Sequence, residues 1–89
     1  MSQVDGYKHL RARPDNWRKQ LWFKDRNMNV WHVVSVMLAN GETPEETAKC
    51  RGMPLEAVLE ALDYYGKHKD TVRADVEEEG RRLRQAGLL

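Results

Sequence analysis

Apolar and polar positions in the middle of the chain alternate with the 3.6-residue period of an amphipathic helix. The first such segment spans Trp31 to Ala39, preceded by Asn29 as a suitable N-cap and followed by Asn40-Gly41, a pair that readily ends a helix in the left-handed conformation. Its apolar stripe consists of Val30, Val33, Val34, Met37 and Leu38. This segment is predicted to be the first helix of the core.

Two further helices are predicted directly after it. Thr43-Pro44-Glu45-Glu46 combines an N-cap residue, a proline at the first helical position and a glutamate at the third, which is a capping box. That helix is expected to run to Arg51 and to stop at Gly52. The next helix is expected to begin at Pro54 and to end or bend near Gly66. Its predicted apolar stripe consists of Leu55, Val58, Leu59, Leu62 and Tyr65.

The segments on either side of these helices have weaker patterns. Residues 1–20 are polar without a clear period and form an arm that is ordered only where it packs, with Trp17 as an anchor. Residues 21–23 and 28–30 are predicted to be two short strands joined by a turn over residues 24–27. A fourth helix, capped by Asp70 or Thr71 and reaching about residue 86, carries too few apolar residues to be a core helix.

These elements predict a mainly α fold, namely a three-helix homeodomain-like helix-turn-helix core with a short N-terminal β-hairpin and an added C-terminal helix. The 89 residues form one domain, divided into an arm (1–20), the hairpin and core (21–69) and the C-terminal helix (70–89). Ala48 is small where two helices must cross, and Gly52 supplies the turn between them. Met53, Val58 and Leu62 are expected to point into the core. The alternative is a compact three-helix domain without a role on DNA.

The overall charge is nearly balanced, so it bears on nucleic-acid binding only in particular segments of the chain. With 15 basic and 14 acidic residues the net charge is +1, which excludes a strongly basic nucleic-acid-coating protein. Basic residues are concentrated in the N-terminal part, and the candidates for DNA-phosphate contacts are Arg11, Arg13, Arg18, Lys19, Lys24 and Arg26. The alternative is a solvated basic arm. The outward positions of the third helix, Glu56, Glu60 and Asp63, would repel a phosphate backbone.

The aromatic residues around the predicted hairpin suggest a homodimer. A hairpin this short needs support from other elements, and pairing across a two-fold axis would supply it. The candidates for this dimer interface are Leu21, Trp22, Phe23, Met28 and Trp31. The alternative is that these side chains form a cap over the small core.

Catalytic chemistry is not expected. His9, His32 and His68 have no spacing that suggests shared metal ligation, and Cys50 is the one cysteine, expected to be small and partly buried. The run Glu77-Glu78-Glu79 is most simply a solvated helix face. We therefore expect a non-enzymatic protein without metal or cofactor. The lack of a second cysteine, a signal peptide or a long apolar run predicts a cytoplasmic protein with no contact to a membrane.

The stretch from Gln20 to about Asp70 resembles domain-of-unknown-function family four-three-three, a prokaryotic family. The matching segments are Asn27 to Val34, Ala39-Asn40-Gly41, Thr43 to Glu46 and, most specifically, Leu55 to Tyr65. The resemblance implies a homeodomain-like core and the role of a VapB-like antitoxin in a type II toxin–antitoxin pair. Such an antitoxin neutralises a PIN-like nuclease and can repress its own operon by binding operator DNA.

This resemblance implies that the C-terminal segment orders on the toxin. The candidate partner-binding residues are Val72, Val76, Arg81, Arg82, Leu83 and Arg84. The arginines would face carboxylates of the acidic metal site in the toxin. Alternatively, this segment is an exposed helix held by charge pairs such as Glu78–Arg82. The alternative functions are a stand-alone DNA-binding transcription regulator and a structural dimer with no toxin.

Overall fold

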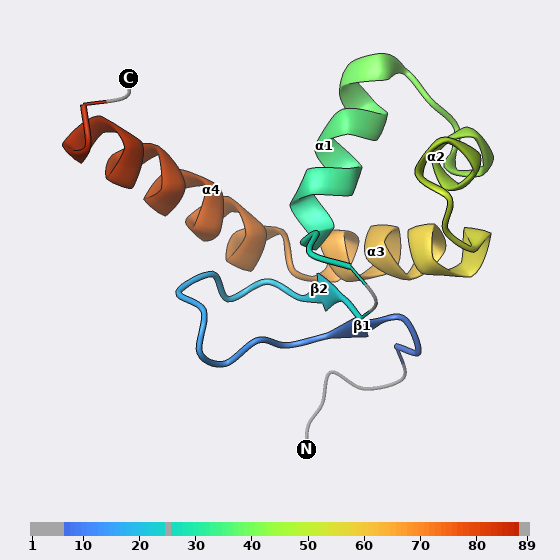
Figure 1. Ribbon diagram of the computed structural model, residues 1–89, viewed down its shortest axis with the longest axis horizontal. Helices are drawn as coiled ribbons and strands as arrows, with labels where there is room; N and C mark the ends of the chain where they lie inside the picture. Colours follow the sequence, from blue (N-terminus) through green and yellow to red (C-terminus); the bar gives the residue numbers. More distant parts are fainter. Residues whose placement is uncertain (1–6, 25, 88–89) are drawn as a thin grey trace.

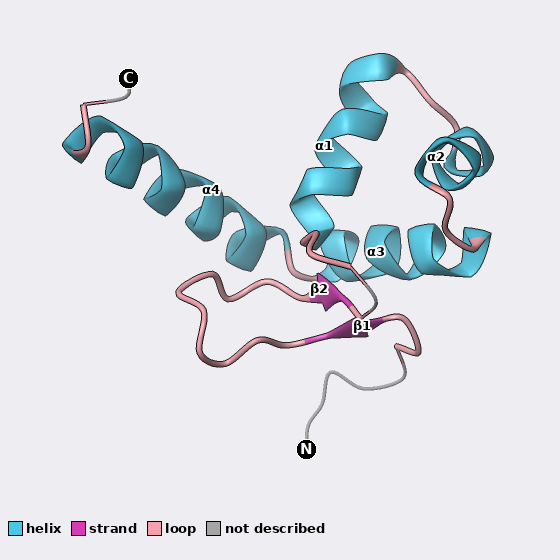
Figure 2. Cartoon of the chain, in the orientation of Figure 1, coloured by secondary structure: helices cyan, strands magenta, loops and turns pink. Residues whose placement is uncertain are grey.

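The computed structural model describes residues 7–24 and 26–87, which form four helices and one two-stranded antiparallel sheet (Figures 1 and 2). The elements in chain order are β1 (Leu10–Arg11), β2 (Trp22–Phe23), α1 (Val30–Asn40), α2 (Pro44–Arg51), α3 (Leu55–Lys67) and α4 (Lys69–Gln85). Helices α1, α2 and α3 form a triangle, the strands lie beside α3, and α4 extends away from the end of α3 (Figure 1). The predicted mainly helical fold with a short hairpin is confirmed at this level.

The predicted ends of α1 and α2 are confirmed. The Asn29 side chain accepts the backbone N–H of His32 at 2.8 Å, and α1 ends at Gly41 with a φ of 65°. Thr43 and Glu46 form the expected capping box, and α2 ends at Gly52 with a φ of 66°. Both glycines occupy the left-handed region, which residues with a Cβ atom adopt only with strain.

The predicted end of α3 near Gly66 is confirmed, whereas the start of α4 differs from the prediction. Helix α3 passes through Gly66 and ends at Lys67, and the backbone N–H of His68 still donates to the carbonyl of Tyr64 at 2.9 Å. A glycine in a helix weakens it but does not end it when the helical hydrogen bonds continue. Helix α4 begins at Lys69 without a side-chain cap, so Asp70 and Thr71 lie inside the helix and cap nothing.

The hairpin is also built from other residues than predicted. Strand β2 pairs with β1, with Leu10 opposite Phe23 and Arg11 opposite Trp22, so the arm supplies the second strand. Residues 28–30 approach β2 only through a single bridge between Trp22 and Asn29. They cannot continue as a strand because Asn29 already caps α1. Asp25, which belongs to the predicted turn over residues 24–27, lies outside the described residues.

The core lies where α3 packs on α1 and α2. The predicted stripe of α1 is buried except for Leu38, whose side chain is 60% exposed. The buried side of α3 is rotated from the predicted one, because Leu55 and Leu59 are exposed. The residues of α3 that are buried are Ala57, Val58, Ala61 and Tyr64. Small alanines let helix axes approach closely, which favours this face over the leucine face.

Helix α4 has two different halves. Its first half belongs to the core, because Val72 is 1% exposed and packs in the main hydrophobic cluster. The helix has few buried residues, as its sparse apolar pattern predicted, but Val72 joins the core instead of a partner surface. Its second half projects away from the helical triangle (Figure 1). None of the described helices offers an apolar stretch that could cross a bilayer.

Candidate functional site

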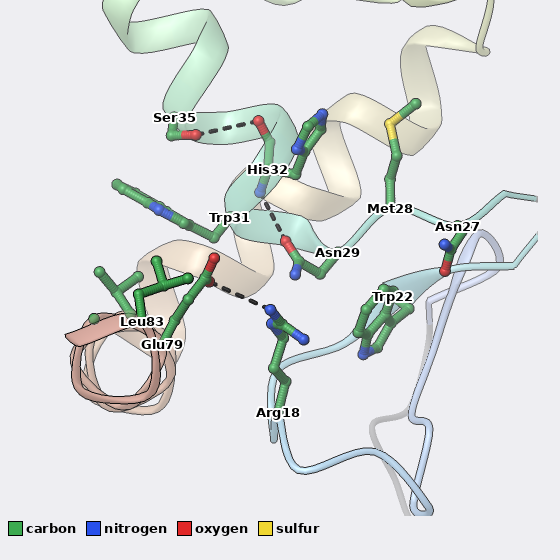
Figure 3. A pocket seen from close by; sticks show the side chains of 12 residues that line it. Arg18, Trp22, Asn27, Met28, Asn29, Trp31, His32, Ser35, Glu79 and Leu83 are labelled. Carbon is green, nitrogen blue, oxygen red and sulfur yellow. Dashed lines mark hydrogen bonds and ion pairs between the residues drawn. The ribbon is translucent and has the colours of Figure 1, made fainter. Parts of the chain in front are cut away.

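A groove of about 620 Å³ opens between the start of α1, the outer part of α4 and the loops that flank β2 (Figure 3). Its apolar lining residues are Trp22, Met28, Trp31, Val76 and Leu83. Its polar lining residues include Arg18, Asn27, Asn29, His32, Ser35 and Glu79. Concave surfaces with aromatic and aliphatic walls and a few polar groups are typical binding sites.

Helical spacing explains how α4 forms one wall of the groove. Val76 and Leu83 stand seven residues apart on α4, and Glu79 lies between them, so all three share one face of that helix. In Figure 3, Leu83 and Glu79 lie on the same side of α4, next to Trp31 of α1. Arg18 reaches across from the loop, and its Nη2 atom lies 3.5 Å from Oε1 of Glu79. The walls of the groove are therefore tied together by an ion pair at one side.

A buried carboxylate fixes the loop against both helices. Asp75 is 4% exposed, and its two oxygens accept the backbone N–H groups of Lys19 and Gln20 at 3.0 and 2.8 Å. The side-chain oxygen of Gln20 in turn accepts the backbone N–H of Trp31 at 2.8 Å. This chain of hydrogen bonds connects α4, the loop and the first turn of α1. It was not predicted, although the position of Asp75 three residues after Val72 would have placed it on the buried face.

Trp17 holds the outer half of α4. The guanidinium carbons of Arg18 and Arg82 lie 4.3 and 4.5 Å from the centre of its ring. Cation–π contacts of this length are attractive even at exposed sites. Trp17 therefore joins the arm to the part of α4 that leaves the core.

The acidic side of α3 points outward as predicted, with Glu56 and Asp63 exposed, but residues of the arm contact part of it. The carboxylate of Glu60 accepts the backbone N–H groups of Lys8 and His9 at 3.0 and 2.8 Å. The Tyr7 hydroxyl donates to Asp63 at 2.7 Å. Burial and this hydrogen bond raise the pKa of Tyr7 to about 12, and the same bond lowers the pKa of Asp63. Residues 7–9 thus occupy the acceptors of Glu60 and Asp63 on the side of α3 that a DNA-reading helix would present.

The structure divides the six candidate phosphate contacts into two groups. Three of them have roles inside the protein. The Arg13 guanidinium lies 4.1 Å from the centre of the Trp22 ring, Arg18 pairs with Glu79, and Arg26 donates to the carbonyl of Arg51 at 3.0 Å. The other three are exposed, and within residues 7–24 and 26–87 they form no ion pair: Arg11, Lys19 and Lys24.

The predicted dimer interface is mostly inside the protomer. Leu21, Trp22 and Phe23 are buried in their own chain, so their side chains form a cap over the core. The physical reason is the pairing of β2 with β1, which supplies the support that a partner hairpin was expected to give. Met28 and Trp31 remain half-buried. Trp31 packs on Tyr65 with ring centres 5.8 Å apart.

The predicted partner-binding residues fall into three groups, which are buried in the core, lining the groove, or exposed on α4. Val72 is a core residue and is not available to a partner, whereas Val76 and Leu83 line the groove. Arg81 and Arg82 both pair with Glu78, and the Glu78–Arg82 pair expected from the sequence is present at 2.9 Å. Arg84 is exposed and has no ion pair among the described residues.

The structure also places the candidate metal ligands and the cysteine. In the described part of the chain, no three His, Cys, Asp or Glu side chains are placed to hold a metal ion. Cys50 is exposed on α2, which corrects the expectation that it is partly buried. His68 stacks on Tyr64 at 4.5 Å, so its ring has a packing role.

The chain was also compared with known proteins. None of the family models, curated proteins or solved structures that were searched matches it. The resemblance to domain-of-unknown-function family four-three-three therefore stays a prediction. The groove between α1 and α4 is the feature from which a function can be argued.

Proposed function

We propose that this protein is a non-enzymatic binding domain, the antitoxin of a type II toxin–antitoxin pair, and that it holds its nuclease partner in the groove between α1 and α4. The observation that carries the proposal is the groove itself, whose walls come from α1, α4 and the segments around β2 and combine aromatic, methionine and aliphatic side chains. Such side chains are enriched in the cores of protein interfaces. The groove is also large enough to receive several side chains of one partner segment.

The charges of α4 support the same role. Arg81 and Arg82 pair with Glu78 at exposed positions, and exposed ion pairs contribute only about 0–1 kcal/mol. These pairs can therefore be exchanged for carboxylates of a partner at little cost. Arg84 is already exposed. A PIN-like nuclease with an acidic metal site would be inhibited by occlusion if α4 lay over that site.

The test is a growth assay in which the protein is expressed with the nuclease encoded next to it. The double variant Val76→Asp, Leu83→Asp places two carboxylates on the apolar wall of the groove. The matched control is Leu38→Asp, Leu59→Asp, which makes the same chemical change at two exposed leucines outside the groove. We expect the groove variant to lose neutralisation and the control to retain it, with both folded by circular dichroism. The opposite pattern would place the partner on α1 and α3 and overturn the proposal.

The contribution of the arginines is tested separately. The triple variant Arg81→Ala, Arg82→Ala, Arg84→Ala is expected to neutralise the nuclease less well. Full neutralisation by this variant would remove the arginines from the mechanism. It would leave the apolar groove as the site of binding.

Operator binding is the second candidate function, and it is favoured only by the exposed Arg11, Lys19 and Lys24. Because Glu60 and Asp63 are engaged by residues 7–9, α3 offers carboxylates and covered surface where a recognition helix offers donors. A gel-shift titration over salt concentration tests it, and no retardation of the protein's own promoter at low salt would exclude it. A purely structural dimer would be favoured if no nuclease gene lay beside this one.

A further inference from the structure

A second hollow adjoins the groove at the other side of Trp31. It measures about 140 Å³ and shares the side chains of Trp31 and Val76 with the groove. Its remaining lining residues are Tyr65, Lys69, Val72 and Arg73. A cavity of about 150 Å³ in a protein takes up one benzene molecule. The hollow therefore has room for one side chain of the size of leucine or phenylalanine.

The walls of the hollow are apolar and fixed. The Trp31 and Tyr65 rings are tilted by 31° to one another with centres 5.8 Å apart, which joins α1 to α3. Val72 is buried in the core, and Val76 is 37% exposed one turn further along α4. An apolar side chain entering here would meet pre-formed surface, so little ordering would be needed on binding.

Two cations border this apolar surface. Lys69 and Arg73 stand four residues apart on α4, on one face with Val72 and Val76, and like charges at this spacing repel one another. Lys69 is also the first residue of α4, where the positive end of the helix dipole disfavours a cation. Across residues 7–24 and 26–87 neither side chain forms an ion pair, and the Lys69 Nζ atom lies 5.9 Å from the centre of the Tyr65 ring.

We propose that this hollow anchors an acidic, apolar segment of the protein partner. One leucine- or phenylalanine-sized side chain enters between Trp31, Tyr65 and Val76, and neighbouring carboxylates of the same segment pair with Lys69 and Arg73. The charge of the site selects this occupant, because a basic segment would add to an existing repulsion and an acidic one relieves it. The inference rests on the proposed function, since the hollow continues the groove in which the partner is held.

The first test uses two short synthetic helical peptides with the same leucine and phenylalanine stripe, one filled with glutamate and one with lysine. Each is titrated into the full-length protein labelled with nitrogen-15. We expect the acidic peptide to shift the indole N–H signal of Trp31 and the amide signals of Val72 and Val76, with an affinity that falls as salt is added. Equal shifts with the basic peptide, or no shift at Trp31, would overturn the proposal.

The second test measures binding of the acidic peptide, and then of the nuclease, to the variant Lys69→Gln, Arg73→Gln. The control Lys8→Gln, Lys49→Gln removes the same two charges from exposed positions outside the hollow. Loss of two part-exposed ion pairs is expected to weaken binding about tenfold, and the control should bind within about twofold of the wild type.

The outcomes separate this inference from the proposed function. If Lys69→Gln, Arg73→Gln binds the nuclease like the control while Val76→Asp, Leu83→Asp does not bind it, the groove holds the partner and the acidic anchor is wrong. If none of these variants affects the nuclease, the proposed function fails at this face. A dimer in light scattering that Lys69→Gln, Arg73→Gln dissociates would assign the hollow to a second copy and would also overturn the acidic anchor.

Discussion

Helices α3 and α4 each hold a segment of the arm through one carboxylate, and the two carboxylates are buried to different extents. On α3, the carboxylate of Glu60 accepts two consecutive backbone N–H groups, those of Lys8 and His9. On α4, the carboxylate of Asp75 does the same for Lys19 and Gln20. One attachment lies just before β1 and the other lies in the loop between β1 and β2. Glu60 is half-buried and Asp75 is 4% exposed, so the comparison isolates what burial adds to one kind of contact.

The two attachments also have different consequences for function. The one at Glu60 holds residues 8 and 9 against the acidic side of α3 and uses the acceptors of that carboxylate. The one at Asp75 holds the loop and the start of α1 beside α4, so that the groove stays open between them. A partly occupied acidic side of α3 and an open groove beside α4 thus arise from the same kind of contact on neighbouring helices.

The largest effect is expected when the buried attachment is broken. The variant Asp75→Ala leaves two backbone N–H groups without their acceptor in a water-poor position, and hydrogen bonds to charged groups contribute about 1.5–3 kcal/mol each. We expect the free energy of unfolding to fall by about 3 kcal/mol in urea denaturation. The control Asp70→Ala changes an exposed carboxylate of the same helix and should cost less than about 1 kcal/mol. Equal losses would show that burial does not decide the strength of the contact.

A smaller effect is expected at the half-buried attachment. In Glu60→Ala the N–H groups of Lys8 and His9 can bond to water, so the free energy of unfolding should fall by only about 1 kcal/mol. Hydrogen exchange at these two amides should accelerate, while exchange at Gln20 should not change. The control Glu56→Ala removes a largely exposed carboxylate and should stay within about 0.5 kcal/mol of the wild type. A loss as large as that of Asp75→Ala would contradict the comparison.

The sequence predicted the parts of the fold that depend on local signals. The caps at Asn29 and Thr43 and the glycine stops at Gly41 and Gly52 are short-range chemistry, and the structure has them where they were expected. The identity of the strand that pairs with β2 was not predicted, because it depends on a contact between Leu10 and Phe23, far apart in the chain. Nothing in the local pattern distinguishes that pairing from a turn to residues 28–30.

The candidate site was predicted only in part for the same reason. Val76 and Leu83 could be placed on one side of α4 from their spacing, and both line the groove. The burial of Trp22 and Phe23 in a cap over the core was foreseen only as the alternative to a dimer interface. The burial of Val72 was not predicted, because it requires knowing that the first half of α4 packs on the core. The hydrogen bonds from backbone N–H groups to Asp75 and Glu60 could not be predicted from a local sequence motif, because the donors lie more than fifty residues away in the chain.

The smallest effect at neutral pH concerns the contact of Tyr7 with Asp63, because it develops only above pH 10. Because the pKa of Tyr7 is raised from 10.0 to about 12, the folded protein keeps the phenol proton at a pH at which the unfolded chain has lost it. This contribution to stability is complete below pH 10 and is lost as the pH rises from 10 to about 12. Residue-specific NMR titration of the Tyr7 ring measures it. In Asp63→Asn the pKa of Tyr7 should fall but remain above 10.0, because burial, the larger cause, is unchanged. A Tyr7 that titrates at its ordinary pKa in the wild type would mean that residues 7–9 leave α3 in solution, and the acidic face would then be free to bind.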